Sequence, residues 1–183
     1  MKTRDTGIGG LTVIEPLVFK DQRGYFFESY HKKKLEQYGI SHTFVQDNQS
    51  RSIRGVIRGL HYQNEPHAQT KLVSVTEGMI FDVAVDIRKG SPTFGKWYGI
   101  ELSADNHLQL LIPKGFAHGF SVLSPHATIF YKCDTYYHPA SDAGIRFDDP
   151  DLQIDWKVDA ASAIISEKDR GLPCFKDFQI KLI

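Results

Sequence analysis

Apolar and other residues alternate along much of this chain, with a period of two. The alternation is cleanest in residues 79–88, where every second position is apolar: Phe81, Val83, Val85 and Ile87. Because successive side chains of a strand point to opposite faces, this run predicts a β-strand with those residues on one face. Asp82, Asp86 and Arg88 then share the other face.

Strand-like runs recur at short intervals and are separated by turns rich in Gly, Pro, Asn and Ser. They cover residues 11–19, 24–30, 42–47, 55–63, 70–75, 79–87, 96–103, 109–113, 118–123 and 127–137. Many short strands at this spacing predict an all-β sandwich or barrel. Two short helices are also expected: one from Ser29 as N-cap through Tyr38, ended by Gly39, and one near residues 160–171.

A second clean alternation directs a tyrosine inward. In residues 127–135, Ile129, Tyr131 and Cys133 share one face, whereas Lys132 falls on the opposite one. The phenol of Tyr131 is therefore expected to point where the apolar side chains point, into the barrel.

The run 55–63 carries polar residues that a core strand normally lacks. Arg58 and His61 lie within it, among aliphatic residues. Either this strand lies on a wet surface, or its polar side chains face a cavity. The two residues have opposite parity, so a β-bulge at Gly59 would be needed to bring both to one cavity.

Two further polar side chains are expected inside. Lys71 has the parity of the two valines that follow it in its strand, and His118 shares a face with the phenylalanines on either side of it. For an isolated histidine, the ordinary interpretation is a hydrogen-bonded core residue. Lys, His and Tyr in one cavity nevertheless suit proton abstraction next to a carbonyl, which needs a base, an acid and a partner for the oxyanion.

Composition narrows the function. The chain has 183 residues, which fits one domain spanning 1–183, and its 22 Lys and Arg balance 22 Asp and Glu. A zero net charge argues against nucleic acid as a partner. Neither a signal peptide nor a membrane span is recognisable, so a cytoplasmic protein without membrane contact is expected. The eight histidines include no H-x-H pair, which disfavours a metal site, and Cys133 and Cys174 are interpreted as free thiols.

Six segments in order carry a resemblance to a known family. They are "DQRGYFFESY" (21–30), "FVQDNQSRSIRGVIRGLHYQ" (44–63), "KLVSVTEGMIFDVAVDIRKGSPTFG" (71–95), "IPKGFAHGFSVLS" (112–124), "YKCDTYYHP" (131–139) and "ISEKD" (165–169). Together they resemble the dTDP-4-dehydrorhamnose 3,5-epimerases over nearly the whole chain. The resemblance implies a mainly β fold, a cupin-like jelly roll with a few short helices, that is homodimeric and needs neither metal nor another cofactor.

The resemblance also implies an activity and its catalytic groups. The substrate would be dTDP-4-dehydro-6-deoxy-D-glucose and the product dTDP-4-dehydro-L-rhamnose. By motif, His61 is the general base, oriented by Asp169, and Tyr131 is the acid that reprotonates the opposite face. Lys71 would stabilise the oxyanion at C4.

Further positions match substrate-binding residues of the family. Arg58 and His118 would bind near the diphosphate and the sugar, Tyr137 would stack on thymine, and Lys168 is another binding position. The nucleotide pocket would comprise Arg23, Phe26, Glu28, Gln46, Asp47 and Asn48, the first three reaching across the dimer. Asp142 stands where the family more often has Glu, which leaves its binding role open.

Alternatives remain at this stage. A sibling enzyme that acts at C3 or C5 only would share the base, the acid and the nucleotide pocket. A metal-dependent cupin enzyme would use His61, His118 and a carboxylate, and a binding module would use the pocket without catalysis. Ordinary structural roles also compete: a surface ion pair for Arg23 with Glu28, and packing for the tyrosines.

Overall fold

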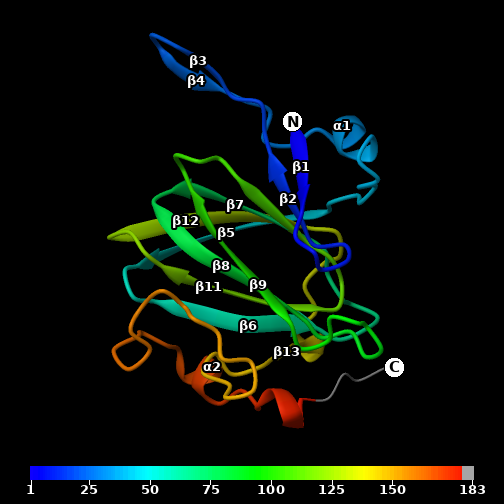
Figure 1. Cartoon of the computed structure of the whole chain (residues 1–183), viewed down its shortest axis with the longest axis vertical. Coiled ribbons are helices and arrows are strands. Elements are labelled where there is room, and N and C mark those ends of the chain that lie inside the picture. Colours follow the sequence, from blue (N-terminus) through cyan, green and yellow to red (C-terminus); the bar gives the residue numbers. More distant parts are fainter. Residues whose placement is uncertain (179–183) are drawn as a thin grey trace.

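The computed structural model describes residues 1–178, and two antiparallel sheets form its body (Figure 1). The first sheet has the order β1 (Lys2–Asp5), β2 (Thr12–Glu15), β10 (Gln109–Ile112), β7 (Lys71–Glu77), β12 (His126–Cys133) and β5 (Gln46–Ile53). The second has the order β13 (Asp142–Gly144), β6 (Ile57–Gln63), β11 (Phe116–Val122), β8 (Met79–Asp86) and β9 (Trp97–Ser103). The expected cupin-like jelly roll is confirmed.

The remaining elements are small. They are the hairpin β3 (Phe19–Asp21) and β4 (Gly24–Phe26), the helices α1 (Lys32–Glu36) and α2 (Glu167–Arg170), and the 3-10 turns η1 (Pro139–Ser141) and η2 (Phe175–Asp177). The hairpin projects from the body at the top of Figure 1. None of the helices in residues 1–178 is both long and apolar enough to cross a bilayer.

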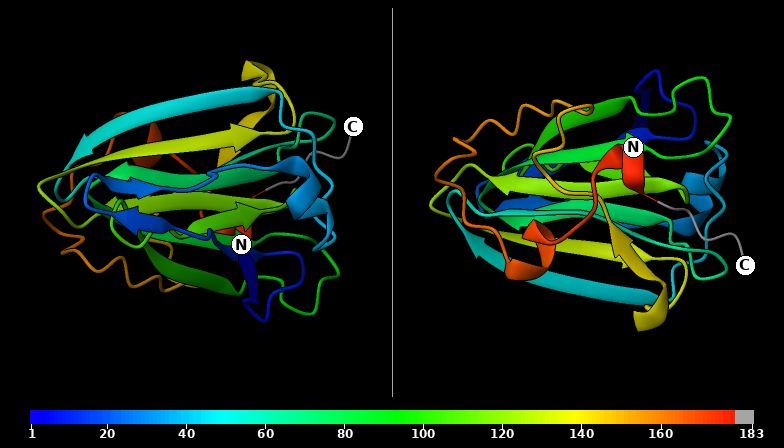
Figure 2. Two further views of the ribbon diagram at one scale, coloured as in Figure 1. Left: turned by 90° about the horizontal axis from the view of Figure 1, so that it is seen from above. Right: turned by 90° about the horizontal axis from the view of Figure 1, so that it is seen from below.

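Two hydrophobic layers bury the second sheet on both faces. One lies between the sheets and contains Ile80 and Ala84 of β8 together with Val73 of β7. The other lies between that sheet and the segment after β13, where Phe81 and Val83 of β8 pack. Figure 2, seen from below, shows this C-terminal segment in orange and red across the sheet.

Because both faces of the sheet are buried, the alternation in β8 does not separate a buried face from a solvent-exposed one. The split into two faces is confirmed, but the face that carries Asp82 and Asp86 is the one turned toward the first sheet, and both carboxylates are fully buried. Their apolar neighbours instead face the C-terminal segment.

The predicted elements agree with the structure except at a few places. Every strand-like run overlaps a strand, but the pattern missed β1 and β13 and placed β5 too early, because β5 is an edge strand of mostly polar sequence. The first helix is shorter than predicted: its N-cap is His31, not Ser29. Gly39 follows it with φ +77°, as expected for a helix end. The predicted second helix is α2.

The bulge at Gly59 is confirmed. His118 pairs with His61 and Phe120 with Arg58, so three steps along β6 match two along β11. Gly59 has φ +117°, and a Cβ there would lie 2.6 Å from the Cα of Gly119. Only glycine fits this close approach.

Candidate active site

A cavity of about 300 Å³ opens at one end of the barrel, where β6 ends and β5 and β7 begin. It is lined by Gln46, Asn48, His61, Tyr62, Gln63, Gln69, Lys71, Tyr131, Tyr137, Asp142 and Lys168. Eight of these positions were expected from the sequence to form the site. Three of the four expected catalytic side chains, those of His61, Lys71 and Tyr131, therefore meet in one cavity although three different strands carry them.

The fourth, Asp169, lies behind His61. Its Oδ1 is 2.8 Å from the Nε2 of His61, and its Oδ2 accepts the Gly59 backbone N–H at 3.1 Å. Because a carboxylate only accepts hydrogen bonds, Nε2 carries the hydrogen and Nδ1 is left with a lone pair. Burial alone would raise the pKa of Asp169, but the hydrogen bond and charge of His61 and the Gly59 N–H lower it below its usual value.

Local sequence places this carboxylate. The Ser166 hydroxyl accepts the backbone N–H of Asp169 at 3.1 Å and caps α2. The short helix then turns the Asp169 side chain inward, where it is 3% exposed. A charged turn, the ordinary interpretation of this segment, is therefore wrong for Asp169, whereas Lys168 does lie on the surface at the rim.

Tyr131 and Lys71 face each other from β12 and β7. The Lys71 ammonium lies 6.0 Å from the centre of the Tyr131 ring. Burial is the main cause that raises the pKa of Tyr131, and the nearby Cys133 adds to it, whereas the charge of Arg58 acts in the opposite direction. The phenol therefore keeps its proton through the neutral range, as an acid must. Burial lowers the pKa of Lys71 below its usual value.

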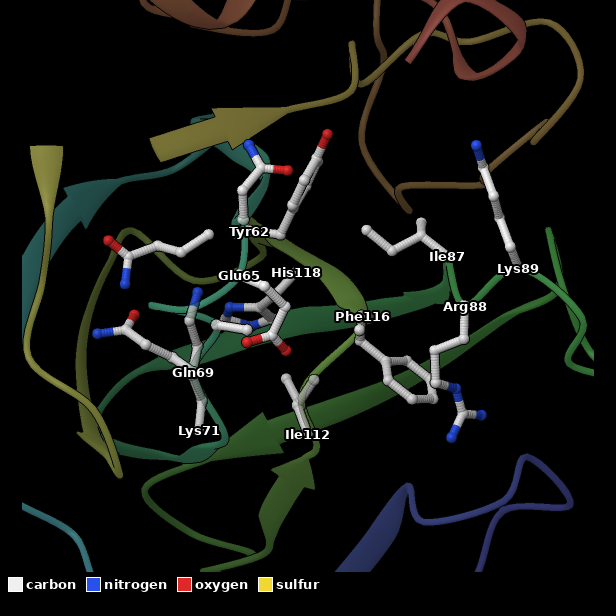
Figure 3. Close-up of a pocket in the computed structure, with 14 residues that line it drawn as sticks. Tyr62, Glu65, Gln69, Lys71, Ile87, Arg88, Lys89, Ile112, Phe116 and His118 are labelled. Carbon is white, nitrogen blue, oxygen red and sulfur yellow. The ribbon is translucent and has the colours of Figure 1, made fainter. Parts of the chain in front are cut away.

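His118 lies in an adjoining cavity of about 260 Å³ that shares Lys71 with the first (Figure 3). Gln63 and Gln69 also line both cavities. Ile112 and Phe116 give this second cavity an apolar wall. The His118 ring is 2.8 Å from the Oδ1 of Asp82 through its Nε2.

The three nucleotide-binding residues expected on β5 point to different faces of the sheet, because odd and even positions of a strand alternate. Gln46 and Asn48 line the cavity. Asp47 does not: it points to the other face of the sheet, where its Oδ1 lies 2.9 Å from the ammonium of Lys132. Grouping Asp47 with its two neighbours was therefore wrong for this chain's own cavity, because adjacent residues of a strand face opposite ways.

Arg58 reaches the site from the side. Its side chain is exposed, donates to the Ser52 hydroxyl at 3.0 Å, and lines a shallow cleft together with His61 and Asp169. The bulge at Gly59 is what brings Arg58 and His61 to one side of the sheet.

Tyr137, Asp142 and Lys168 form a part of the rim that adjoins β5. The hydroxyl of Tyr137 lies 3.3 Å from Oδ2 of Asp142, and the same carboxylate forms an ion pair with Lys168. The backbone N–H of Tyr137 donates to the Gln46 side chain at 2.8 Å. The shorter arm of Asp142 still reaches both partners, so the aspartate keeps a carboxylate at the cavity rim.

Arg23, Phe26 and Glu28 do not reach the cavity of their own chain. Arg23 and Phe26 lie on the projecting hairpin. The alternative of an ion pair between Arg23 and Glu28 is wrong: Arg23 pairs with Asp21, and Glu28 with Lys34 of α1.

Sequence reasoning missed several polar residues that line these cavities, among them Gln63 and Gln69, and it also missed Asp82, which lies behind His118. Gln63 follows His61 by two positions and Gln69 precedes Lys71 by two, so parity with the catalytic residues would have identified both. For Asp82 there was no such signal. The period-two alternation of its strand separates two faces but does not reveal which of them is turned toward the interior of the barrel. In residues 1–178, no three His, Cys, Asp or Glu side chains are grouped so that they could hold a metal ion.

A jelly-roll barrel of this topology, with a histidine, a tyrosine and a lysine in the cavity at one end, is characteristic of the cupin-like sugar epimerases. These enzymes are isomerases. The family model of dTDP-4-dehydrorhamnose 3,5-epimerase matches residues 5–177. This chain belongs to that family.

Relatives agree with this assignment. A dTDP-4-dehydrorhamnose 3,5-epimerase of Escherichia coli is 52% identical over 168 residues, which are 91% of this chain and 90% of the relative. The Legionella pneumophila enzyme, solved in complex with dTDP-4-keto-L-rhamnose, has a TM-score of 0.93 at 50% identity, covering 97% and 94% of the two chains. A 3'-monoepimerase from Streptomyces bikiniensis, solved with dTDP-quinovose, has a TM-score of 0.84 at 32% identity, covering 91% and 84%.

Proposed function

We propose that this chain epimerises dTDP-4-dehydro-6-deoxy-D-glucose at C3 and C5 and so forms dTDP-4-dehydro-L-rhamnose. The observation that carries the proposal is the placement of His61, Tyr131 and Lys71 on three strands around one cavity. Such an arrangement supplies a base, an acid and a cation to a ketone bound between them.

The chemistry follows from the ketone at C4, which acidifies the hydrogens on both neighbouring carbons. The Nδ1 lone pair of His61 takes the proton, the C–H electron pair forms the enolate, and Asp169 stabilises the resulting imidazolium. The Lys71 ammonium donates to the enolate oxygen. The phenol of Tyr131 then gives its proton to the opposite face of the carbon, and the configuration inverts. A positioned acid or base contributes typically about 10²–10⁴-fold.

We propose that Gln46, Asn48, Tyr137, Lys168 and Asp142 bind the nucleotide at the cavity rim. Arg58 and His118 complete the binding site, Arg58 at the diphosphate and His118 at the sugar. The diphosphate is dianionic, and a guanidinium binds such groups with two parallel hydrogen bonds. No redox cofactor is required, because both steps are proton transfers.

A homodimer supplies the rest of the pocket in this proposal. Phe19, Tyr25 and Phe26 on the projecting hairpin are 59–66% exposed, an unusual solvent exposure for three neighbouring aromatic side chains. An arm of this kind suits docking onto a second copy, where Arg23, Phe26 and Glu28 would complete the partner's nucleotide pocket. We also propose that residues 1–183 form one catalytic domain. Its two free thiols and its nucleotide-sugar substrate favour the cytoplasm.

Mixing two inactive variants tests the shared pocket. Arg23→Ala removes the arm contact and His61→Ala removes the base. Dimers that contain one chain of each hold one intact composite site, so unfolding and refolding the mixture should restore part of the activity. No recovery in a mixture that does form heterodimers contradicts the exchange of arms.

Proton NMR of the substrate with enzyme in D₂O tests the reaction itself. Deuterium should enter at both C3 and C5, and the product should have the L-lyxo configuration of 4-dehydro-L-rhamnose. Exchange at only one of the two carbons would favour the alternative of a mono-epimerase, a class to which one structural relative belongs.

A further inference from the structure

Asp82 is a buried carboxylate in the wall of the barrel that the mechanism above does not use. It lies on the inner face of β8, is fully buried, and accepts a hydrogen bond from the Nε2 of His118 at 2.8 Å. Its second oxygen, Oδ2, is also buried and has no hydrogen-bond partner among residues 1–178. A charged oxygen in this position is costly unless a positive charge lies close by.

Three cations line the cavity that His118 faces, namely Lys71, Arg88 and Lys89. Arg88 is paired with Asp86, and Lys89 is exposed to solvent, as is Glu65, the carboxylate in the same lining. Lys71 is the remaining cation.

Lys71 and His118 line the same cavity (Figure 3), and the negative charge of Asp82 acts on Lys71. Burial lowers the pKa of Lys71, while Cys133, Asp82 and Asp142 act in the opposite direction.

The other two groups are poor counter-ions. Burial raises the pKa of the Cys133 thiol, so it is uncharged in the neutral range. The Asp142 carboxylate is already paired with Lys168 at the rim. His61 and Tyr131 line the first cavity, which Lys71 also lines, but an imidazole and a phenol carry no negative charge. Of the three groups, Asp82 is the fully buried carboxylate: one oxygen is paired with His118, and the other has no hydrogen-bond partner within residues 1–178.

We propose that Asp82 is a positioning residue that keeps Lys71 charged and fixes the ring of His118, so that the enolate oxygen meets an ammonium donor. The inference rests on the proposed function, since it explains how a half-buried lysine in the cavity stays protonated. An uncharged amine would donate a weaker hydrogen bond and would leave the enolate's charge uncompensated.

The position of Asp82 in the fold suits this role. His118 and His61 are directly paired across β11 and β6, and Asp82 is the carboxylate behind the first of them, as Asp169 is behind the second. Asp82 therefore acts from the side of the cavity away from the base, where it can hold the cation without competing for the His61 proton.

The alkaline limb of the rate profile tests the proposal. Asp82→Asn keeps the shape of the side chain and removes its charge, so the pKa of Lys71 should fall further. The alkaline limb of kcat should move to lower pH by about one unit or more, as expected for the loss of a nearby opposite charge. Asp82→Glu, which restores the charge, should return the limb toward its original position.

Asp86 provides the matched control. It lies four residues along the same strand and face and is equally buried, but its oxygens are taken by Arg88, Ser91 and Thr93 in the turn after β8. Asp86→Asn should lower the thermal stability and leave the alkaline limb of kcat in place. If both variants move the limb equally, the effect is structural and the proposal is wrong.

A direct titration supplies a second readout that needs no substrate. The ¹³Cε resonance of Lys71, in protein with labelled lysine and assigned with Lys71→Arg, reports the charge of the amine. Wild-type Lys71 should be protonated at pH 7 and should titrate at a lower pH in Asp82→Asn. A wild-type Lys71 that is neutral at pH 7, or an unchanged titration in the variant, overturns the proposal. Failure of the proposed function would look different: wild-type enzyme would cause no exchange at C3 or C5, whatever Lys71 does.

Discussion

Two imidazole–carboxylate pairs lie side by side in this barrel and are chemically alike but differ in their surroundings. His61 and His118 are cross-strand neighbours, and each is 2.8 Å from an aspartate oxygen. The His61 side chain is 32% exposed in the open cavity, whereas that of His118 is 9% exposed. Asp169 uses both oxygens, but Asp82 leaves one unpartnered within residues 1–178.

The difference separates two tasks. A general base must reach its substrate and needs its carboxylate fixed, which fits His61 with Asp169. A buried carboxylate with one unpartnered oxygen can compensate the positive charge of another group, which fits the role proposed for Asp82 toward Lys71. In our proposals, the same pair of residue types therefore serves proton transfer at one position and charge compensation at the other.

The largest expected effect distinguishes the two histidines. His61→Ala should lower kcat by about 10²–10⁴-fold and abolish deuterium exchange at both carbons, because it removes the group that takes the proton. His118→Ala should lower kcat less and retain exchange. Rate measurements and NMR in D₂O on both variants check this, with circular dichroism to confirm folding. Equal loss of exchange in the two would break the comparison.

Removal of the acid should give a different pattern. In Tyr131→Phe, His61 can still remove a proton and return a deuteron to the same face. Deuterium exchange into the starting sugar should therefore persist while epimerised product falls by about 10²-fold or more. Product stereochemistry and deuterium content, measured on one sample, separate the two processes. Loss of exchange in parallel with product would place Tyr131 in the deprotonation step instead.

The carboxylates should differ in a more modest way. Asp169→Asn leaves an amide beside His61 Nε2 that favours the wrong tautomer, so kcat should fall at every pH by about 10–10²-fold, near the lower bound for a positioned base. The alkaline limb should stay in place, in contrast to Asp82→Asn. A kcat profile from pH 5 to 10 for both variants checks the contrast.

The smallest effect concerns stability. The pKa of Asp169 is lower in the folded chain than its ordinary value, because the contacts with His61 and Gly59 outweigh burial. A group with a lowered folded pKa stabilises the fold above its unfolded pKa and loses that contribution as pH falls through the folded one. The free energy of unfolding should therefore fall from pH 5 toward pH 3 more steeply in wild type than in Asp169→Asn, as urea titrations would record. Equal slopes contradict this origin.

Much of the cavity could be predicted before the fold was known. Alternation alone placed Tyr131 inward and gave Lys71 the parity of its buried neighbours. The glycine between Arg58 and His61 allowed the bulge that one shared cavity would require, and the structure has that bulge. Each of these inferences uses only neighbours within a few residues. Resemblance to the family was needed for Asp169, which is 108 positions from His61 in the sequence.

The sequence by itself determined most of the strands, the two faces of those with clean alternation and the inward direction of several polar side chains, because a period of two is a local property of the backbone. Only the tertiary structure decided which face of β8 is inside, since layers from distant parts of the chain cover both. It likewise decided that Asp47 turns away from the cavity, that Asp169 lies behind His61, and that the Asp82 carboxylate is buried behind His118. Such contacts join residues that are remote in sequence, and no local periodicity encodes them.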